Sequence, residues 1–168
     1  ARILIADDEE NFRKVLRKEL VRKGHDVEDV PGGAEALERL SERAFDTLLL
    51  DLNMPGLDGL QVLRRLREQG LGTEVVLLTG QGTIASAVEA IRNGAFDYLT
   101  KPCAIEAVEA VCLRAAEKAR LARENRLLRQ DLARGLNPLL GEGPAMTSLR
   151  QRITRIAATA APVMILGE

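Results

Sequence analysis

The sequence has 168 residues and a nearly balanced charge, with 24 Lys and Arg against 25 Asp and Glu and a net charge of -1. This length accommodates one well-packed domain with an extension, or two small domains. The balanced charge gives no general attraction to nucleic acid or to a membrane surface. With one Tyr and no Trp, the chain also lacks an aromatic surface for stacking bases.

No apolar segment approaches the ~20 residues that span a bilayer, and no signal-peptide pattern opens the sequence. We therefore expect a soluble, cytoplasmic protein with no membrane partner. The two cysteines, Cys103 and Cys112, have neither a CxxC spacing nor a neighbouring His, so we interpret them as buried thiols in a reducing compartment.

Five short apolar segments recur at nearly even intervals along the first part of the chain. Segments that are apolar on both faces are typical of parallel strands covered by helices on both sides. Helical periodicity fills the intervals between them. The alternation predicts an α/β fold, a doubly wound parallel sheet over residues 1–117. The expected strands are Arg2–Ala6, His25–Val30, Thr47–Asp51, Glu74–Thr79 and Phe96–Thr100.

A long helix is expected after the last strand, because no Gly or Pro interrupts the sequence from Ala104 to Arg134. Such a helix would be roughly 45 Å long and would extend past the sheet. Its second half repeats Leu and Asn at spacings of four and three, as in a short two-stranded coiled coil, although a solvated single helix remains the alternative. The seam residues of this linker, residues 118–135, are Leu121, Asn125, Leu128 and Leu132.

Residues 136–168 contain a loop-like stretch, a helical pattern and a short strand-like apolar run. A lone helix and strand cannot bury their apolar faces against each other. We therefore interpret this segment as the beginning of a second domain.

Acidic and polar residues follow the predicted strands at one edge of the sheet. Ligands of open α/β sheets bind beyond the carboxyl ends of the strands. Clustered carboxylates repel one another unless a hard cation such as Mg²⁺ neutralises them, and a carboxylate beside that cation can attack phosphorus. A hydroxyl and an ammonium group would then supply hydrogen-bond donors and positive charge to the phosphoryl oxygens. The residues at this edge are Asp7, Asp8, Asp51, Thr79 and Lys101.

Each of these residues also has a simpler interpretation when it is taken alone. Asp7 or Asp8 can cap the following helix, and Asp58 is interpreted as cap and turn chemistry. Thr79 alone is a strand-end hydroxyl, and Lys101 alone is a surface charge. Their joint position at one sheet edge favours the functional interpretation.

The same residues resemble the receiver domain of two-component response regulators. The resemblance rests on Asp7-Asp8, on LLLDLNMPGLDG around Asp51, on LLTGQG at Thr79, and on GAFDYLTKP ending at Lys101-Pro102. It implies a flavodoxin-like fold with strand order 2-1-3-4-5 and a phosphorylation-dependent signalling switch. It also implies a cis Lys101-Pro102 bond.

By that resemblance, Asp51 accepts a phosphoryl group from a sensor histidine kinase, and Lys101 contacts this group. The resemblance also implies a Mg²⁺ site, which Mn²⁺ could fill instead. Its ligands would be Asp7, Asp8, Asp51 and the main-chain carbonyl of Asn53.

The resemblance further assigns a switch pair and two positions that tune the lifetime of the phosphoryl group. The switch pair is Thr79 and Tyr98. The lifetime positions are Asn53 and Gln81, and neither is an acid here. His25 matches no phosphotransfer role, and we interpret it as structural.

The TGQGTIASAVEAIRNGAFDY and ENRLLRQDL stretches resemble NtrC-like activators of sigma-54 polymerase, and residues 139–168 resemble the opening of their AAA+ ATPase domain. The resemblance implies a homodimer whose assembly controls an attached ATPase, with sigma-54 polymerase and DNA as partners of further domains. The sequence stops before the Gly-Lys-Ser/Thr of a phosphate-binding loop, so we expect ATP binding only in a full-length protein.

Two other classes of function remain open. A haloacid-dehalogenase-like, Mg²⁺-dependent aspartyl phosphatase would need a second Asp where this chain has Asn53. A stand-alone phosphorelay receiver is disfavoured by the linker and tail, and a dimerisation module with a silent site is disfavoured by the complete acidic cluster. We therefore expect no enzymatic activity beyond the receiver's own phosphotransfer and dephosphorylation.

Overall fold

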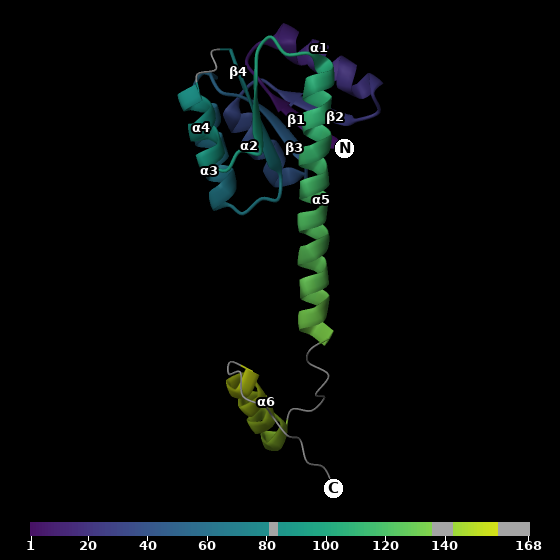
Figure 1. The fold of residues 1–168 in the computed structure, drawn as a ribbon, viewed down its shortest axis with the longest axis vertical. Coiled ribbons are helices and arrows are strands. Elements are labelled where there is room, and N and C mark those ends of the chain that lie inside the picture. The colour runs from purple at the N-terminus through teal and green to yellow at the C-terminus, as the bar shows by residue number, and fades with distance from the viewer. Residues whose placement is uncertain (81–83, 136–142, 158–168) are drawn as a thin grey trace. The chain divides into compact units, whose positions relative to one another are not determined.

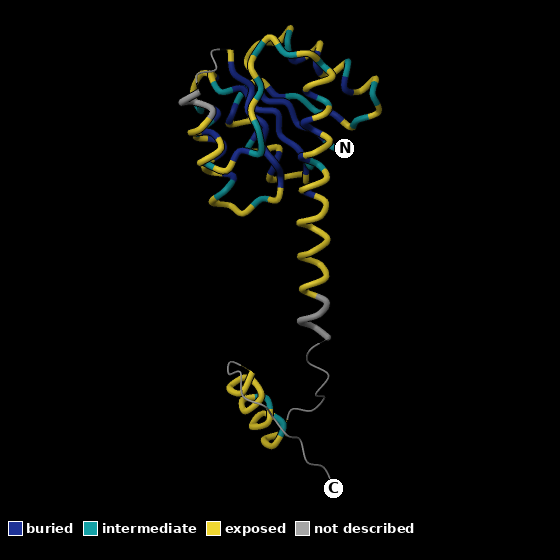
Figure 2. Tube along the Cα trace, viewed as in Figure 1, coloured by how far each residue is buried: buried dark blue, intermediate teal, exposed yellow. Residues whose placement is uncertain are grey.

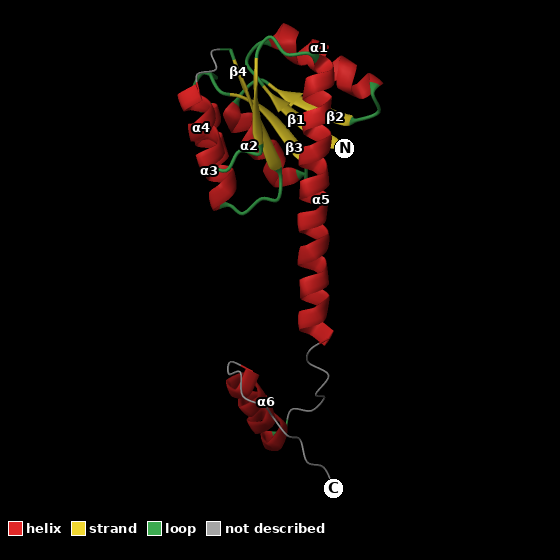
Figure 3. Ribbon diagram, viewed as in Figure 1, coloured by secondary structure: helices red, strands yellow, loops and turns green. Residues whose placement is uncertain are grey.

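The computed structural model describes residues 1–80, 84–135 and 143–157, and for residues 84–87 and 131–135 it describes the backbone alone. The chain forms two compact units, Ala1–Asn125 and Arg126–Glu168. The first unit contains a five-stranded parallel sheet in the order β2-β1-β3-β4-β5 (Figures 1 and 3). The fold class and strand order expected from the sequence are therefore confirmed. The strands are β1 (Arg2–Ala6), β2 (Asp26–Val30), β3 (Thr47–Asp51), β4 (Glu74–Thr79) and β5 (Asp97–Thr100).

Helices cover both faces of this sheet. One core cluster joins the sheet to α1 and α5, and the other joins it to α2, α3 and α4. The central strands β1, β3 and β4 are almost entirely buried, which appears as the dark blue centre of Figure 2. This burial on both faces explains why their sequences are apolar at successive positions. The helices are α1 (Glu10–Arg22), α2 (Gly33–Glu42), α3 (Gly59–Glu68), α4 (Ile84–Arg92), α5 (Ile105–Gly135) and α6 (Pro144–Ala157).

Local sequence signals fix several helix ends in the first unit. A glycine follows each of three helices, and the φ angles of Gly24, Gly70 and Gly94 are 89°, 64° and 92°. Residues with a Cβ adopt this left-handed backbone conformation only at an energetic cost. Asp58 accepts a hydrogen bond from the Gln61 amide, and the Gln61 side chain accepts one from the Asp58 amide. This capping box confirms that Asp58 serves the start of α3.

The long helix α5 has 31 residues, as the uninterrupted sequence predicts. Its first part packs on the sheet as far as Ala119, whereas residues 120–130 are exposed. Of the proposed seam, Leu121 and Leu128 are 52% and 58% exposed. Asn125 is exposed too, and the Leu132 side chain lies outside the described residues. No helix in the described ranges combines the length and apolar composition that crossing a bilayer requires.

In the second unit the structure describes the end of α5 and one whole helix, α6. The helix has no buried residue, and its apolar side chains Leu149, Ile153 and Ile156 are 41%, 46% and 39% exposed. The strand-like run that the sequence indicates near the chain end lies outside the described residues.

Candidate functional site

The carboxyl ends of β1, β3 and β5 bring two carboxylates and one ammonium group into direct contact. Lys101 Nζ lies 2.6 Å from Asp7 Oδ2 and 2.8 Å from Asp51 Oδ1. Asp7 is fully buried, and Asp51 is 4% exposed. Buried carboxylates of like charge are stable together only with a compensating cation, and here Lys101 supplies that charge.

The Asp7 carboxylate is fixed from two sides. Its Oδ1 atom accepts a hydrogen bond from the Glu9 amide at 2.9 Å, while Oδ2 contacts Lys101. Burial raises the pKa of the Asp7 carboxyl above its usual value, although the hydrogen bonds from Lys101 and Glu9 act in the opposite direction. Glu9 is the N-cap residue of α1 and has no side-chain cap bond, so neither aspartate serves as the N-cap.

The Asp51 carboxylate is held in the same way at the end of β3. Its Oδ2 atom accepts a hydrogen bond from the Asn53 amide at 2.9 Å. The main chain of Asp51 also meets the start of α3 closely, because a Cβ on Gly59 would lie 2.4 Å from the Asp51 carbonyl oxygen. A glycine at position 59 therefore allows the close approach of α3 to the acidic residue.

Lys101 is positioned by its backbone as well as by its ion pairs. Its amide donates to the Thr79 carbonyl at 2.7 Å, and the expected cis Lys101-Pro102 bond is present. Its ammonium also lies 4.5 Å from the centroid of the Phe12 ring. Burial lowers the pKa of Lys101, but the hydrogen bonds and charges of Asp51 and Asp7 outweigh it and raise this pKa to about 12. The side chain is therefore a permanent cation at neutral pH.

The proposed switch residues lie on the neighbouring strands β4 and β5. Thr79 is 4% exposed at the end of β4, whereas Tyr98 is 37% exposed. In the strand register Thr79 pairs with Thr100, and Leu77 pairs with Tyr98. Because alternate residues of a strand share a face, Thr79 and Tyr98 are placed on the same side of the sheet.

The remaining predicted site residues are two metal ligands and a second lifetime position. Asp8 and Asn53 are exposed next to the buried pair, and Gln81 lies outside the described residues. Among the described residues, no group of three or more acidic, His or Cys side chains is arranged to hold a metal ion. The donor set still fits a hard cation, because the two buried carboxylates already enclose a positive charge, the Lys101 ammonium.

Three further side chains near the site were not singled out from the sequence. Glu9 lies 3.5 Å from Lys101, Phe12 faces the same ammonium, and Arg13 donates to the Asp7 carbonyl. The position of Glu9 beside the acidic pair was the only sequence signal for this group. Phe12 and Arg13 follow the helical pattern of α1, which gives no indication of contact with the site.

Comparison with known proteins identifies the family. Residues 3–112 match the family model of the response regulator receiver domain. The chain belongs to this family. Receiver domains are phosphorylated by histidine kinases and generally use Mg²⁺ for this reaction. The matched residues include both buried carboxylates, Thr79, Tyr98 and Lys101.

Several regulatory proteins resemble this receiver domain and the segment that follows it. The C4-dicarboxylate transport transcriptional regulatory protein DctD of Rhizobium meliloti (strain 1021) is 37% identical over 169 residues, covering 99% of this chain and 36% of that protein. The regulatory protein AtoC of Escherichia coli (strain K12) is 34% identical, covering 99% of this chain and 37% of that protein. The chain thus spans little more than a third of these relatives.

Solved structures agree with the same assignment. NtrX from Brucella abortus in complex with ADP superposes with a TM-score of 0.70 at 35% identity, covering 95% of this chain and 34% of that chain. The separate receiver domain of NtrX superposes with a TM-score of 0.65 at 35% identity, covering 68% of this chain and 98% of that chain. The receiver fold is therefore complete within the first unit.

Proposed function

We propose that Asp51 is the phosphoacceptor of this receiver domain. The observation that carries the proposal is the contact of Lys101 with both Asp51 and Asp7, because it joins a carboxylate nucleophile to a cation at the ligand-binding edge of the sheet. A carboxylate oxygen of Asp51 attacks the phosphorus of a phosphohistidine on a sensor kinase. The O–P bond forms as the P–N bond breaks, and Lys101 stabilises the phosphoryl oxygens.

Asp7, Asp8, Asp51 and the main-chain carbonyl of Asn53 would hold Mg²⁺, or Mn²⁺ in its place. The bound ion supplies positive charge that offsets the repulsion between the carboxylates and the incoming phosphoryl group. Asp7 and Asp51 have the burial and fixed orientation that this role needs, and Asp8 lies beside them. Asn53 and Gln81 are the positions at which the lifetime of the acyl phosphate is tuned.

Thr79 and Tyr98 would transmit the phosphorylated state. The phosphoryl charge at Asp51 draws the Thr79 hydroxyl toward the site. The half-exposed Tyr98 ring then turns into the space that the Thr79 side chain has left. The exposure of Tyr98 and the burial of Thr79 support this direction of movement. The face made by α4, β5 and α5 changes as a result.

The output is proposed to be a change in self-association through the linker. The layout has a receiver at residues 1–117, a helical linker at 118–135 and the start of an AAA+ ATPase domain at 136–168. The exposed seam residues Leu121, Asn125 and Leu128 support pairing with a second copy of this chain. In a longer protein like its relatives, this pairing would control an ATPase that acts on sigma-54 polymerase at DNA.

Sedimentation of the chain with the phosphoryl mimic beryllofluoride tests this proposal. We expect the mimic to change the association state only when Mg²⁺ is present. The Asp51→Asn variant should show no response under the same conditions. Failure of wild-type protein to bind the mimic would overturn the assignment of Asp51. Binding without any change in association would instead reject the linker as the output.

A further inference from the structure

We propose that Arg13 is a positioning residue for the acidic site, because its guanidinium fixes the peptide bond that joins Asp7 to Asp8. The inference rests on the function proposed above. Arg13 lies near the start of α1 and is only 9% exposed, which is rare for an arginine outside an ion-binding or structural network. Its contacts show what holds it there.

The Arg13 guanidinium connects two parts of the sheet. Its Nη1 atom donates a short hydrogen bond to the main-chain carbonyl of Asp7. Its Nε atom donates to Asp29 Oδ2 at 3.3 Å, and Asp29 lies in β2. One side chain thus ties the loop after β1 to the neighbouring edge strand.

This contact determines the direction of a peptide plane at the site. The Asp7 carbonyl is buried and needs a donor, which Arg13 provides. Because a peptide bond is planar, fixing the Asp7 carbonyl also fixes the amide of Asp8. The Asp7 carboxylate has two restraints of its own, but Asp8 is exposed, so the orientation of its backbone depends on this bond.

Arginine is suited to this position for a geometric reason. Its several N–H donors point in different directions in one plane, so a single group can serve the Asp7 carbonyl and the Asp29 carboxylate together. A lysine ammonium at the same position could satisfy one acceptor well but not both. Arg13→Lys should therefore preserve the charge and only part of the restraint.

Calorimetric titration with Mg²⁺ alone tests the role of Arg13. We expect Arg13→Gln to weaken Mg²⁺ binding by about tenfold, in the range found when groups behind metal ligands are removed. Amide hydrogen exchange at Asp8 and Glu9 should become faster in the same variant. An affinity equal to wild type, with only a lower unfolding midpoint in urea, would show that Arg13 acts on the fold alone.

Arg17→Gln is the matched control. Arg17 pairs with the same Asp29 carboxylate at 3.4 Å and also donates to the Val27 carbonyl, but its side chain is 54% exposed. We expect its Mg²⁺ affinity and its exchange at Asp8 to equal those of wild type. Equal losses in the Arg13 and Arg17 variants would assign the effect to Asp29 and overturn the proposal.

Two further variants keep the outcomes distinct. If Arg13→Gln does not fold, Arg13→Lys provides the test, with an expected loss of about threefold in Mg²⁺ affinity. A Mg²⁺ affinity and an amide exchange rate equal to wild type in Arg13→Lys would overturn the proposal. Asp51→Asn separates the two levels of inference. Wild-type affinity in Asp51→Asn would refute the metal site itself, whereas loss in Asp51→Asn without loss in the Arg13 variants would refute only the positioning role.

Discussion

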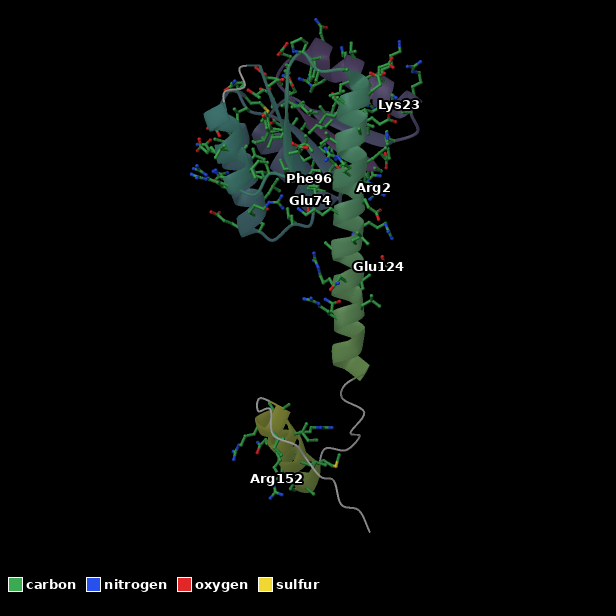
Figure 4. The ribbon with its side chains drawn as sticks, in the orientation of Figure 1. Arg2, Lys23, Glu74, Phe96, Glu124 and Arg152 are labelled. Carbon is green, nitrogen blue, oxygen red and sulfur yellow. The ribbon has the colours of Figure 1, made fainter. Side chains whose placement is uncertain are left out.

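Glu74, at the start of β4, pairs with Lys118 of α5, and its Oε1 atom lies 3.1 Å from Lys118 Nζ. Figure 4 labels Glu74 among the side chains of the first unit. A second pair follows on the same helix, where Arg123 Nη2 lies 3.1 Å from Asp46 Oδ1. Between these pairs, Ala119 is the last buried residue of α5 among those whose side chains are described, which reach residue 130. The first unit thus holds the helix beyond the end of its apolar contacts, at the edge of the sheet opposite the acidic site.

Removing both cations from this anchor should loosen α5 without altering the phosphorylation site. Each pair has one exposed partner, so we expect a loss of only about 0.5–1 kcal/mol of unfolding free energy per pair for Lys118→Gln and Arg123→Gln. Amides near the two substituted residues should exchange faster in the double variant, measured by mass spectrometry. Arg120→Gln is the control, because Arg120 pairs only with Glu117 and Glu124 of its own helix among the described contacts. Equal exchange in both variants would argue against an anchor.

The Lys101 ammonium should stabilise the fold most when no metal ion is bound. Lys101→Met leaves the buried Asp7 and Asp51 carboxylates without their cation, and we expect a loss of about 1–3 kcal/mol in unfolding free energy. Mg²⁺ should restore more stability to this variant than it adds to wild type, because the ion replaces the missing charge. Urea unfolding with and without Mg²⁺ measures both effects. An identical Mg²⁺ increment in the two proteins would contradict this account of the site.

The sequence predicted the framework well because its signals are local. Strand apolarity, the glycines that end helices and the Asp58 cap each depend on neighbouring residues, and all appear in the structure. The position of Asp51 at a strand end could also be predicted, since parallel strands present their carboxyl ends at one edge.

Other features depend on contacts between distant residues and left no local pattern. Predicting the contact of Arg13 with the Asp7 carbonyl would require the orientation of α1 relative to β1 and β2. The ion pair of Arg123 with Asp46 joins residues far apart in sequence, and no local pattern around either residue indicates it. Helical periodicity identifies a buried face, but it does not identify the carbonyl or carboxylate that a long polar side chain reaches.

The two cysteines should differ in reactivity in the folded protein. Burial raises the pKa of the Cys112 thiol to about 12, and the pKa of the half-buried Cys103 is raised less strongly by the same cause. Because the thiolate is the reactive form, a disulfide reagent should modify Cys103 first and Cys112 only after unfolding. Both should react at similar rates in urea, which is the control. Rapid labelling of Cys112 in folded Cys103→Ser protein would contradict its burial against the sheet.

The same shift of Cys112 affects stability at high pH. Its pKa rises from 9.0 in the unfolded chain to about 12 in the folded protein, so the stability that the protonated thiol contributes is fully present below pH 9. Above that pH the unfolded chain loses this proton first, and stability falls until the folded thiol also ionises. Cys112→Ala should therefore lose less unfolding free energy than wild type between about pH 9 and pH 11.

Replacing Thr79 should separate phosphorylation from its output. Thr79→Ala keeps Asp51 and Lys101 in place, so we expect acyl phosphate formation from a small-molecule phosphodonor to remain near the wild-type level. The change in association should weaken, because the hydroxyl that follows the phosphoryl group is gone. Thr79→Ser, which keeps the hydroxyl, should behave like wild type. If the association change of Thr79→Ala persists in full, the route through Thr79 and Tyr98 is wrong.

Pairing of two linkers should depend on charge as well as on the exposed leucines. With Asn125 at an a position, Glu124 occupies g and Arg129 occupies the e position of the next heptad, so these residues of two parallel chains would face each other. Leu128→Asp should abolish the beryllofluoride-dependent dimer in sedimentation. Glu124→Arg should weaken it, because each introduced arginine would oppose Arg129 of the second chain.

The double variant Glu124→Arg with Arg129→Glu tests the orientation of this dimer. In a parallel, in-register pair the two exchanged charges again attract, so association should return close to the wild-type level, whereas an antiparallel pair places different residues together and shows no such recovery. In wild type, Glu124 also contacts Arg120 of its own helix at 3.2 Å. Helix content by circular dichroism must therefore be equal in all variants before a difference in association is assigned to the pairing of two chains.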